Sequence, residues 1–171
     1  MMKYLEGEEL TEDEVMSGLR KGIQEGTVVP VVCCSAASRV GVAKLLDNVV
    51  DLMPSPEGTV TEGTNPKTGE AVQRACTDSE PFSAHVFKTM ADPFVGKLSL
   101  MKVTSGVLEG STALYNVNAE KAEKPGTIYF LKGKKQTTTN SVCAGDLCAL
   151  AKLASVATGN TLCDAANPVK F

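Results

Sequence analysis

Six cysteines and one histidine are the side chains of this chain best suited to metal or thiol chemistry. A zinc or redox site requires several of these groups at short, regular spacing, as in Cys-x-x-Cys. No Cys-x-x-Cys occurs, and His85 is far in sequence from every cysteine. Four cysteines lie in apolar, strand-like segments, namely Cys33, Cys34, Cys143 and Cys148. We therefore expect reduced cysteines packed as small hydrophobic side chains, and no metal site.

Acid–base chemistry has no recognisable constellation in this sequence. His85 falls in the middle of an expected strand, without a serine, cysteine or carboxylate in a known pattern. Asp92 and Asp146 adjoin proline or glycine, where aspartate usually bonds nearby backbone N–H groups. We expect no catalytic residue, and an enzyme that uses His85 or a cysteine is the least supported alternative.

Lysine shows the clearest binding pattern. Residues 1–80 carry seven Lys/Arg against fourteen Asp/Glu (−7), whereas residues 81–171 carry ten lysines against six acids (+4). Three lysines surround a flexible Gly133, namely Lys132, Lys134 and Lys135. Three more lie on or beside the hairpin expected over residues 82–106, namely Lys88, Lys97 and Lys102. Their ammonium groups suit RNA phosphates. The alternative is a solvated lysine-rich turn at residues 132–135 and isolated surface lysines elsewhere, and the sequence alone favours this alternative.

Composition sets the broad class. A chain of 171 residues, 43% hydrophobic and 22% charged, holds one ample domain or a small domain with part of a neighbour. No apolar run approaches the roughly 18 residues of a membrane helix, and the first residues lack the design of a signal peptide. We expect a cytoplasmic protein without a membrane partner.

The pattern of the first 54 residues predicts an incomplete α/β domain. Thr11 and Glu14 form a capping-box pattern that opens a helix ending near Gly26. The apolar run 28–34 predicts a strand, with Pro30 placing it at a sheet edge, and residues 42–53 predict an amphipathic helix that stops before Pro54. One strand cannot build a sheet, so we expect residues 1–54 to be the C-terminal remnant of a larger domain.

The remainder of the chain predicts β structure. Residues 55–81 are rich in Pro, Gly, Thr and charge, and we expect a linker in which residues 65–69 turn a possible small hairpin. From Phe82 onward no helical period persists. Strand candidates recur at 82–89, 97–104, 112–117, 127–132, 136–143 and 147–153. Short strands at this spacing predict a mainly β fold, with residues 82–171 forming a closed antiparallel β-barrel.

The hairpin over residues 82–106 is the most informative stretch. Phe82 and Val86 share one side of the first strand, Asp92 breaks the alternation, and Gly96 permits the reversal. In the second strand the alternation slips between Leu100 and Met101, which indicates a bulge or a switch of face.

Residues 82–106 resemble the opening hairpin of the second domain of elongation factor G, the ribosomal translocase. Further resemblances follow in the same order, over residues 3–11, 29–36, 41–56, 144–147 and 158–164. The resemblance covers nearly the whole chain and implies the end of a GTPase domain followed by a domain II barrel. Asn160 and Cys34 stand where the family usually has Asp and Gly, and residues 131–136 are closer to a divergent second type of elongation factor G.

The resemblance also implies sites. Ser35 and Ala36 match the loop whose backbone N–H groups contact the guanine base in the family. The chain lacks G-x-x-x-x-G-K-[ST], Asp-x-x-Gly and Asn-Lys-x-Asp, which hold the phosphates, magnesium and guanine. We expect this chain to bind no GTP and to be no enzyme. GTP and magnesium are the cofactors of the intact parent.

The implied partners are the small-subunit rRNA of the ribosome, reached through the six lysines, and the missing GTPase and following domains. DNA is not an expected partner. The implied role is docking and coupling during tRNA–mRNA translocation in protein synthesis. Two alternatives stay open: another translational GTPase, of the ribosomal protection or release factor three type, and a free-standing barrel that binds some other ligand.

Overall fold

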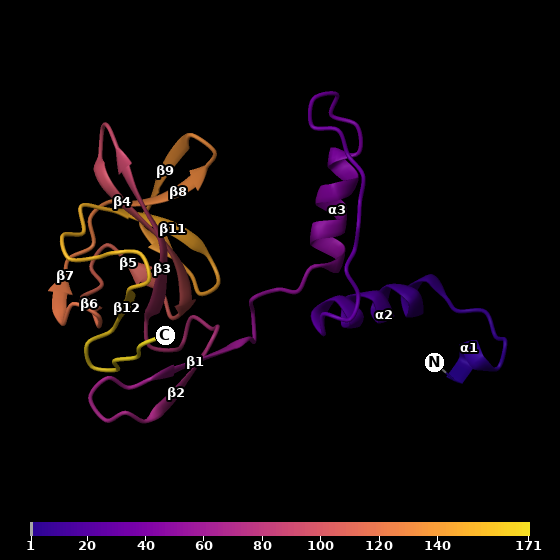
Figure 1. Ribbon diagram of the computed structural model, residues 1–171, viewed down its shortest axis with the longest axis horizontal. Coiled ribbons are helices and arrows are strands. Elements are labelled where there is room, and N and C mark those ends of the chain that lie inside the picture. Colours follow the sequence, from indigo (N-terminus) through magenta and orange to yellow (C-terminus); the bar gives the residue numbers. More distant parts are fainter. Residues whose placement is uncertain (1) are drawn as a thin grey trace. The chain divides into compact units, whose positions relative to one another are not determined.

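The computed structural model describes residues 2–171, which divide into two compact units. The first ends at Ser55 and is helical, and the second, Pro56–Phe171, is built of strands (Figure 1). Each unit is described separately below. Among the described residues, no helix has the length and apolar character required to cross a bilayer.

The helical unit contains α1 (Met2–Leu5), α2 (Glu12–Gln24) and α3 (Val42–Leu52). The predicted capping box opens α2: the Glu14 N–H donates to Thr11 Oγ1 at 3.3 Å, and the Thr11 N–H donates to Glu14 Oε2 at 3.0 Å. These two bonds satisfy N–H groups that the first helical turn leaves without partners. Both predicted long helices are therefore formed.

The strand predicted over residues 28–34 is not formed. Among the described residues this stretch has no ladder partner, and only Ser35 makes an isolated bridge, to Val40. Val29 and Val31 are 79% and 87% exposed. A strand requires a neighbour to satisfy its N–H and C=O groups, and no other strand lies in the described part of this unit. The apolar run is extended chain whose hydrophobic side chains remain in solvent.

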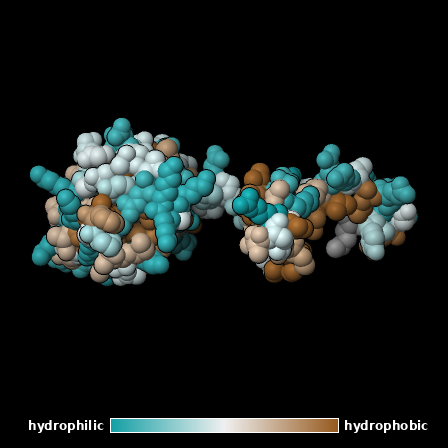
Figure 2. All heavy atoms as spheres, turned by 90° about the horizontal axis from the view of Figure 1, so that it is seen from above, coloured by the Kyte–Doolittle hydropathy of each residue, from teal (hydrophilic) through white to brown (hydrophobic). Residues whose placement is uncertain are grey.

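The helical unit has almost no core of its own. Leu52 is its one buried hydrophobic side chain among the described residues. Many large hydrophobic side chains of the unit are exposed instead, and hydrophobic atoms gather over its surface in Figure 2: Tyr4, Leu5, Leu10, Val15, Val28, Val29, Val31, Val32, Val40, Leu46, Val49, Val50 and Met53. Amphipathic helices obtain most of their stability by packing the apolar face, which these helices scarcely do.

The second unit is a β unit made of short strands. Their bounds are β1 Val60–Thr64, β2 Ala71–Ala75, β3 Ser83–Asp92, β4 Gly96–Ser105, β5 Leu108–Glu109, β6 Leu114–Asn116, β7 Lys121–Glu123, β8 Ile128–Lys132, β9 Lys135–Thr139, β10 Ser141–Val142, β11 Leu147–Ala151 and β12 Thr161–Cys163. Eight of them form one antiparallel sheet in the order β7-β6-β12-β3-β4-β11-β8-β9, and β1-β2 and β10-β5 pair separately.

The sheet wraps around one main core, and two smaller clusters of buried side chains are separate from it. One cluster of buried side chains draws on strands spread across the whole order: Phe82, Ala84, Val86, Met101, Val103, Leu108, Leu114, Ile128, Val142, Cys148, Leu150, Leu153, Val156 and Leu162. A flat sheet would not bring residues of β6 and β8 into one cluster. The hydrogen-bonded sheet ends at β7 and β9. Its two end regions are therefore held together by side-chain packing in the core rather than by strand pairing. The mainly β, antiparallel fold class predicted from the sequence is confirmed.

The slip predicted between Leu100 and Met101 is a β-bulge. Met101 pairs with Val86 and Leu100 pairs with Lys88, which leaves Phe87 of β3 as the extra residue. β3 therefore has one more residue than β4 between these two pairs, and the side chains change face at the bulge. The predicted reversal is also present, because β4 begins at Gly96, whose φ is +80°.

Residues 60–75, in the stretch expected to be a linker with a possible hairpin, form the β1–β2 hairpin of the β unit. Thr64 and Lys170 exchange backbone hydrogen bonds of 2.9 Å in both directions. A Cβ on Gly63 would lie 2.7 Å from Val169 Cγ2, so only glycine fits where the hairpin meets the C-terminal segment. The boundary between the two units falls between Ser55 and Pro56.

All six cysteines are free thiols. Cys76, Cys148 and Cys163 are buried as expected, and burial raises the pKa of the Cys148 thiol to about 12. Cys33, Cys34 and Cys143 are exposed, so the expectation of buried packing was wrong for these three. The segment of Cys33 and Cys34 has no sheet to cover it, which explains the difference there.

Candidate nucleic-acid interface

The turn between β8 and β9 gathers three of the six predicted lysines. Lys132 and Lys135 are paired across the hairpin, with Gly133 (φ +61°) and Lys134 between them, and all three ammonium groups belong to exposed residues. The ion pairs of the described residues, Lys3–Glu14 and Lys21–Glu25, both lie in the helical unit. Three like charges on one tight turn repel one another, so binding an anion there is favourable.

The turn between β3 and β4 is organised by Asp92. Its Oδ1 accepts hydrogen bonds from the Phe94 N–H at 2.9 Å and the Val95 N–H at 3.0 Å. Bonds from Val95 and Phe94, with a smaller one from Gln136, hold the pKa of the Asp92 carboxyl below its ordinary value. The expectation that Asp92 is a turn residue is confirmed, and the turn projects Phe94 with 95% of the residue exposed.

One side-chain bond joins these two turns. Gln136 Nε2 of β9 donates to Asp92 Oδ2 at 2.8 Å, although the residues are 44 positions apart. Figure 1 shows the β3–β4 and β8–β9 turns at the same end of the β unit. The lysines at 132, 134 and 135 therefore lie beside the turn that carries Phe94, and the two turns form one surface, which we call the turn surface.

Lys88 and Lys102 lie on the outer face of the sheet instead. Lys88 pairs with Leu100, and Lys102 pairs with His85 on one side and Leu147 on the other. Paired residues of an antiparallel ladder point to the same face, so both lysines flank an apolar hollow of about 150 Å³. Its lining residues are Phe87, Leu100, Leu131, Leu147 and Cys148. Both lysines are exposed and free to extend this positive face.

Lys97 has a structural role. Its Nζ donates to the Val156 carbonyl, and its charge acts on Glu123. Burial by itself would raise the pKa of the Glu123 carboxyl, but hydrogen bonds from Ser155 and Ala154, with Lys97 nearby, hold that pKa below its ordinary value. Glu123 in turn accepts from the Ser155 N–H at 2.6 Å. Lys97 thus binds the loop after β11, and this bond engages its ammonium group.

His85 has no catalytic surroundings among the described residues. Its neighbours across the sheet are Lys102 and Thr161, and its Nδ1 is buried without a hydrogen-bond partner. A general base requires a group that fixes its tautomer, usually a carboxylate, and none is bonded here.

Ser35 and Ala36 occupy a tight turn of the helical unit. The Ser35 N–H donates to the Val40 carbonyl at 2.9 Å, and Ser35 Oγ accepts from the Ser38 hydroxyl at 2.7 Å. Ala36 is exposed at the start of the turn. In this conformation the Ser35 N–H is used within the loop, so it offers nothing to a base.

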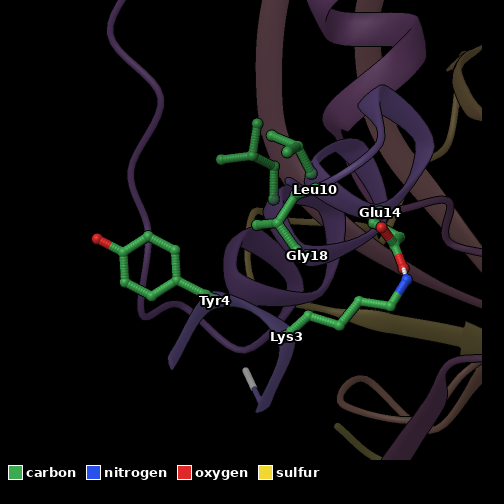
Figure 3. A pocket seen from close by; sticks show the side chains of 7 residues that line it. Lys3, Tyr4, Leu10, Glu14 and Gly18 are labelled. Atoms are coloured by element: carbon green, nitrogen blue, oxygen red, sulfur yellow. Dashed lines mark hydrogen bonds and ion pairs between the residues drawn. The ribbon is translucent and has the colours of Figure 1, made fainter. Parts of the chain in front are cut away.

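An open hollow of about 600 Å³ lies against α2 in the helical unit. Lys3, Tyr4, Leu10, Glu14 and Gly18 surround it in Figure 3, with Val15 and Leu19 completing the lining. Its polar side chains among the described residues are Tyr4 and the Lys3–Glu14 ion pair, whose 2.6 Å contact satisfies both charges. The hollow lacks convergent free polar groups, and its apolar wall is an unfilled packing surface.

Two residues of the turn surface were not predicted as functional, namely Phe94 and Gln136. An aromatic side chain inside a turn that follows Asp-Pro is a signal that the sequence does carry. Gln136 has no such signal, because its partner Asp92 is reached only through the fold.

Comparison with known proteins identifies relatives of this chain. Residues 81–165 match the family model described as elongation factor G domain 2. A crystal structure of a protein from Thermus thermophilus is similar over 97% of this chain, with a TM-score of 0.71 and 25% sequence identity. The chain covers 22% of that protein, so it spans less than a quarter of its length.

Proposed function

Residues 81–165 of this chain belong to the elongation factor G domain 2 family, and from this premise we propose that the β unit docks a translation factor on the small ribosomal subunit. The observation that carries the proposal is the turn surface within the matched residues, where Lys132, Lys134 and Lys135 present exposed charge without ion-pair partners among the described residues. Lysine ammonium groups bind the phosphates of RNA and release counterions when they do so.

The helical unit is proposed to belong to the GTPase domain of the same factor. Its exposed apolar side chains then pack against the rest of that domain. That domain binds GTP and magnesium, and its hydrolysis of GTP drives tRNA–mRNA translocation. In this proposal the present chain is a binding and coupling module rather than an enzyme. The occupied Ser35 N–H and the missing phosphate-binding motifs support this division of labour.

A free-standing barrel that binds a small ligand is less well supported. The apolar hollow on the outer face measures about 150 Å³. Ligand pockets for drug-sized molecules usually measure about 300–1,000 Å³. A second hollow, along the β3–β4 hairpin, measures about 400 Å³ and is open to solvent. The exposed lysines of the turn surface suit a large polyanion better than a small molecule.

The test is binding of the whole chain to purified small ribosomal subunits over a salt series. Replacing Lys134 and Lys135 together by alanine removes two phosphate contacts. Each contact contributes about −0.7 to the slope of log K against log salt on single strands, so the slope should become shallower by about 1.4. The matched control replaces Lys121 of β7 and the nearby Lys124, two exposed lysines, and should leave the slope unchanged because β7 lies at the other end of the β unit from the β8–β9 turn (Figure 1). An equal change in both variants would refute the assignment.

A further inference from the structure

Phe94 is more exposed than any other large hydrophobic side chain among the described residues, at 95%. An exposed aromatic ring on a mobile loop would lose conformational entropy on binding, which would weaken any contact that it makes. Here the backbone beneath the ring is fixed, because Asp92 Oδ1 binds the N–H groups of both Phe94 and Val95. Asp92 Oδ2 is tied to Gln136 of the neighbouring hairpin. The turn thus holds in place the backbone from which the exposed ring projects into water.

The surroundings of the ring are cationic and open. The bond between Gln136 and Asp92 places the β8–β9 turn, which carries the three lysines, next to the β3–β4 turn that carries the ring. An open hollow of about 400 Å³ borders the same hairpin, lined by Thr89, Met90, Ala91, Asp92, Gly96 and Lys97. A nucleotide that leaves an RNA helix has room to enter there.

A fixed aromatic ring beside several lysines is how proteins bind unpaired nucleotides. The base stacks on the ring, and the lysines contact the adjoining phosphates. A continuous A-form duplex hides its base faces in the stack and offers only its backbone and groove edges. We propose that Phe94 stacks on an unpaired nucleotide of RNA held at the turn surface. This inference rests on the proposed docking and specifies the kind of RNA element that the surface contacts.

The first experiment uses Phe94→Trp in the whole chain. The sequence contains no tryptophan, so the introduced indole is the only tryptophan fluorophore. Stacking should quench its emission when single-stranded oligouridylate is added. A GC-rich RNA duplex of equal length should bind through the lysines with little quenching. Equal emission changes with both RNAs, or none with either, would overturn the stacking.

The second experiment measures small-subunit binding of Phe94→Ala and Phe94→Leu at several salt concentrations. A stacked base contributes about 1–3 kcal/mol, so Phe94→Ala should weaken binding by about 5- to 140-fold. The salt slope should stay unchanged, because no phosphate contact is lost. Phe94→Leu keeps an apolar side chain without a ring face and should lose most of the same affinity. Because Phe94 is exposed, both variants should fold as the wild type does, and circular dichroism checks this.

The outcomes separate this inference from the docking itself. If the Lys134/Lys135 double variant weakens binding but Phe94→Ala does not, the docking stands and the stacking is overturned. If Phe94→Leu binds as tightly as the wild type, the ring makes a general apolar contact with a protein, and the stacking is again overturned. If the wild-type chain does not bind small subunits at low salt, both proposals fail.

Discussion

The helical unit and the β unit contain similar proportions of apolar residues, but only the β unit buries many of them. In the helical unit Leu52 alone is buried, whereas every other buried hydrophobic side chain among the described residues lies in the β unit. The β unit encloses its main core because strands from across the sheet order pack side chains into one cluster. The two amphipathic helices contact each other, but with the unpaired extended segment they bury only Leu52 among the described residues. Periodicity therefore predicts which face of an element is to be buried, and only the presence of partners decides whether it is.

The largest expected difference between the units concerns thiol reactivity. A pKa of about 12 leaves the buried Cys148 with about a thousandfold less thiolate than a free cysteine. Cys33 and Cys34 are exposed in the helical unit. Brief treatment of the native chain with iodoacetamide should modify these two and spare Cys148, as read by peptide mass spectrometry. Denaturant should abolish the difference, and rapid native labelling of Cys148 would contradict the closed core.

The second-largest expected difference is the loss of stability when a leucine is shortened to alanine in each unit. Leu162 is fully buried, and Leu162→Ala should lower the free energy of unfolding of the β unit by about 2–5 kcal/mol. Leu46 of α3 is 60% exposed, and Leu46→Ala should change stability by less than about 0.5 kcal/mol. Urea unfolding followed by circular dichroism measures both. Similar losses in the two variants would mean that the helical unit has a core after all.

Two glycines with the same backbone conformation sharpen the comparison. Gly106 (φ +69°) lies where a Cβ would be 2.6 Å from the Glu80 carbonyl oxygen, and Gly26 (φ +71°) has nothing within 4 Å. Gly106→Ala should cost about 2–4 kcal/mol, from strain and crowding together. Gly26→Ala should cost only the strain of about 1–2 kcal/mol. Thermal melts of the two variants should differ accordingly, and equal melting temperatures would exclude the crowding.

The smallest effect is a pH dependence of α2. Hydrogen bonds from Lys3 and then Thr11 lower the pKa of Glu14 to about 2, from an ordinary 4.5. A carboxyl whose pKa is depressed by folding stabilises the helix above its unfolded pKa, and the contribution is lost as the pH falls. Helicity should therefore decrease between about pH 4.5 and pH 2, when followed by circular dichroism. Glu14→Gln, which cannot titrate, should lack this component, and an unchanged profile in the variant would contradict it.

Local sequence determined the parts of the fold that depend on near neighbours. The capping box at Thr11, the helix over residues 42–53, the β3–β4 reversal at Gly96 and the bulge opposite Leu100 and Met101 were all predictable. Each arises from side chains within a few positions, or from the period of one strand. The clustering of Lys132, Lys134 and Lys135 was predictable for the same reason, since one turn carries all three.

Contacts between distant residues decided the rest. In the sequence Lys97 could not be distinguished from the other five predicted lysines. In the structure its ammonium group donates to the Val156 carbonyl. The segment 28–34 has the composition of a strand and lacks the partner that would make it one. The turn surface exists because Gln136 reaches Asp92 across 44 positions. Sequence patterns record what each segment prefers, whereas pairing and burial depend on which other segments are there to meet it.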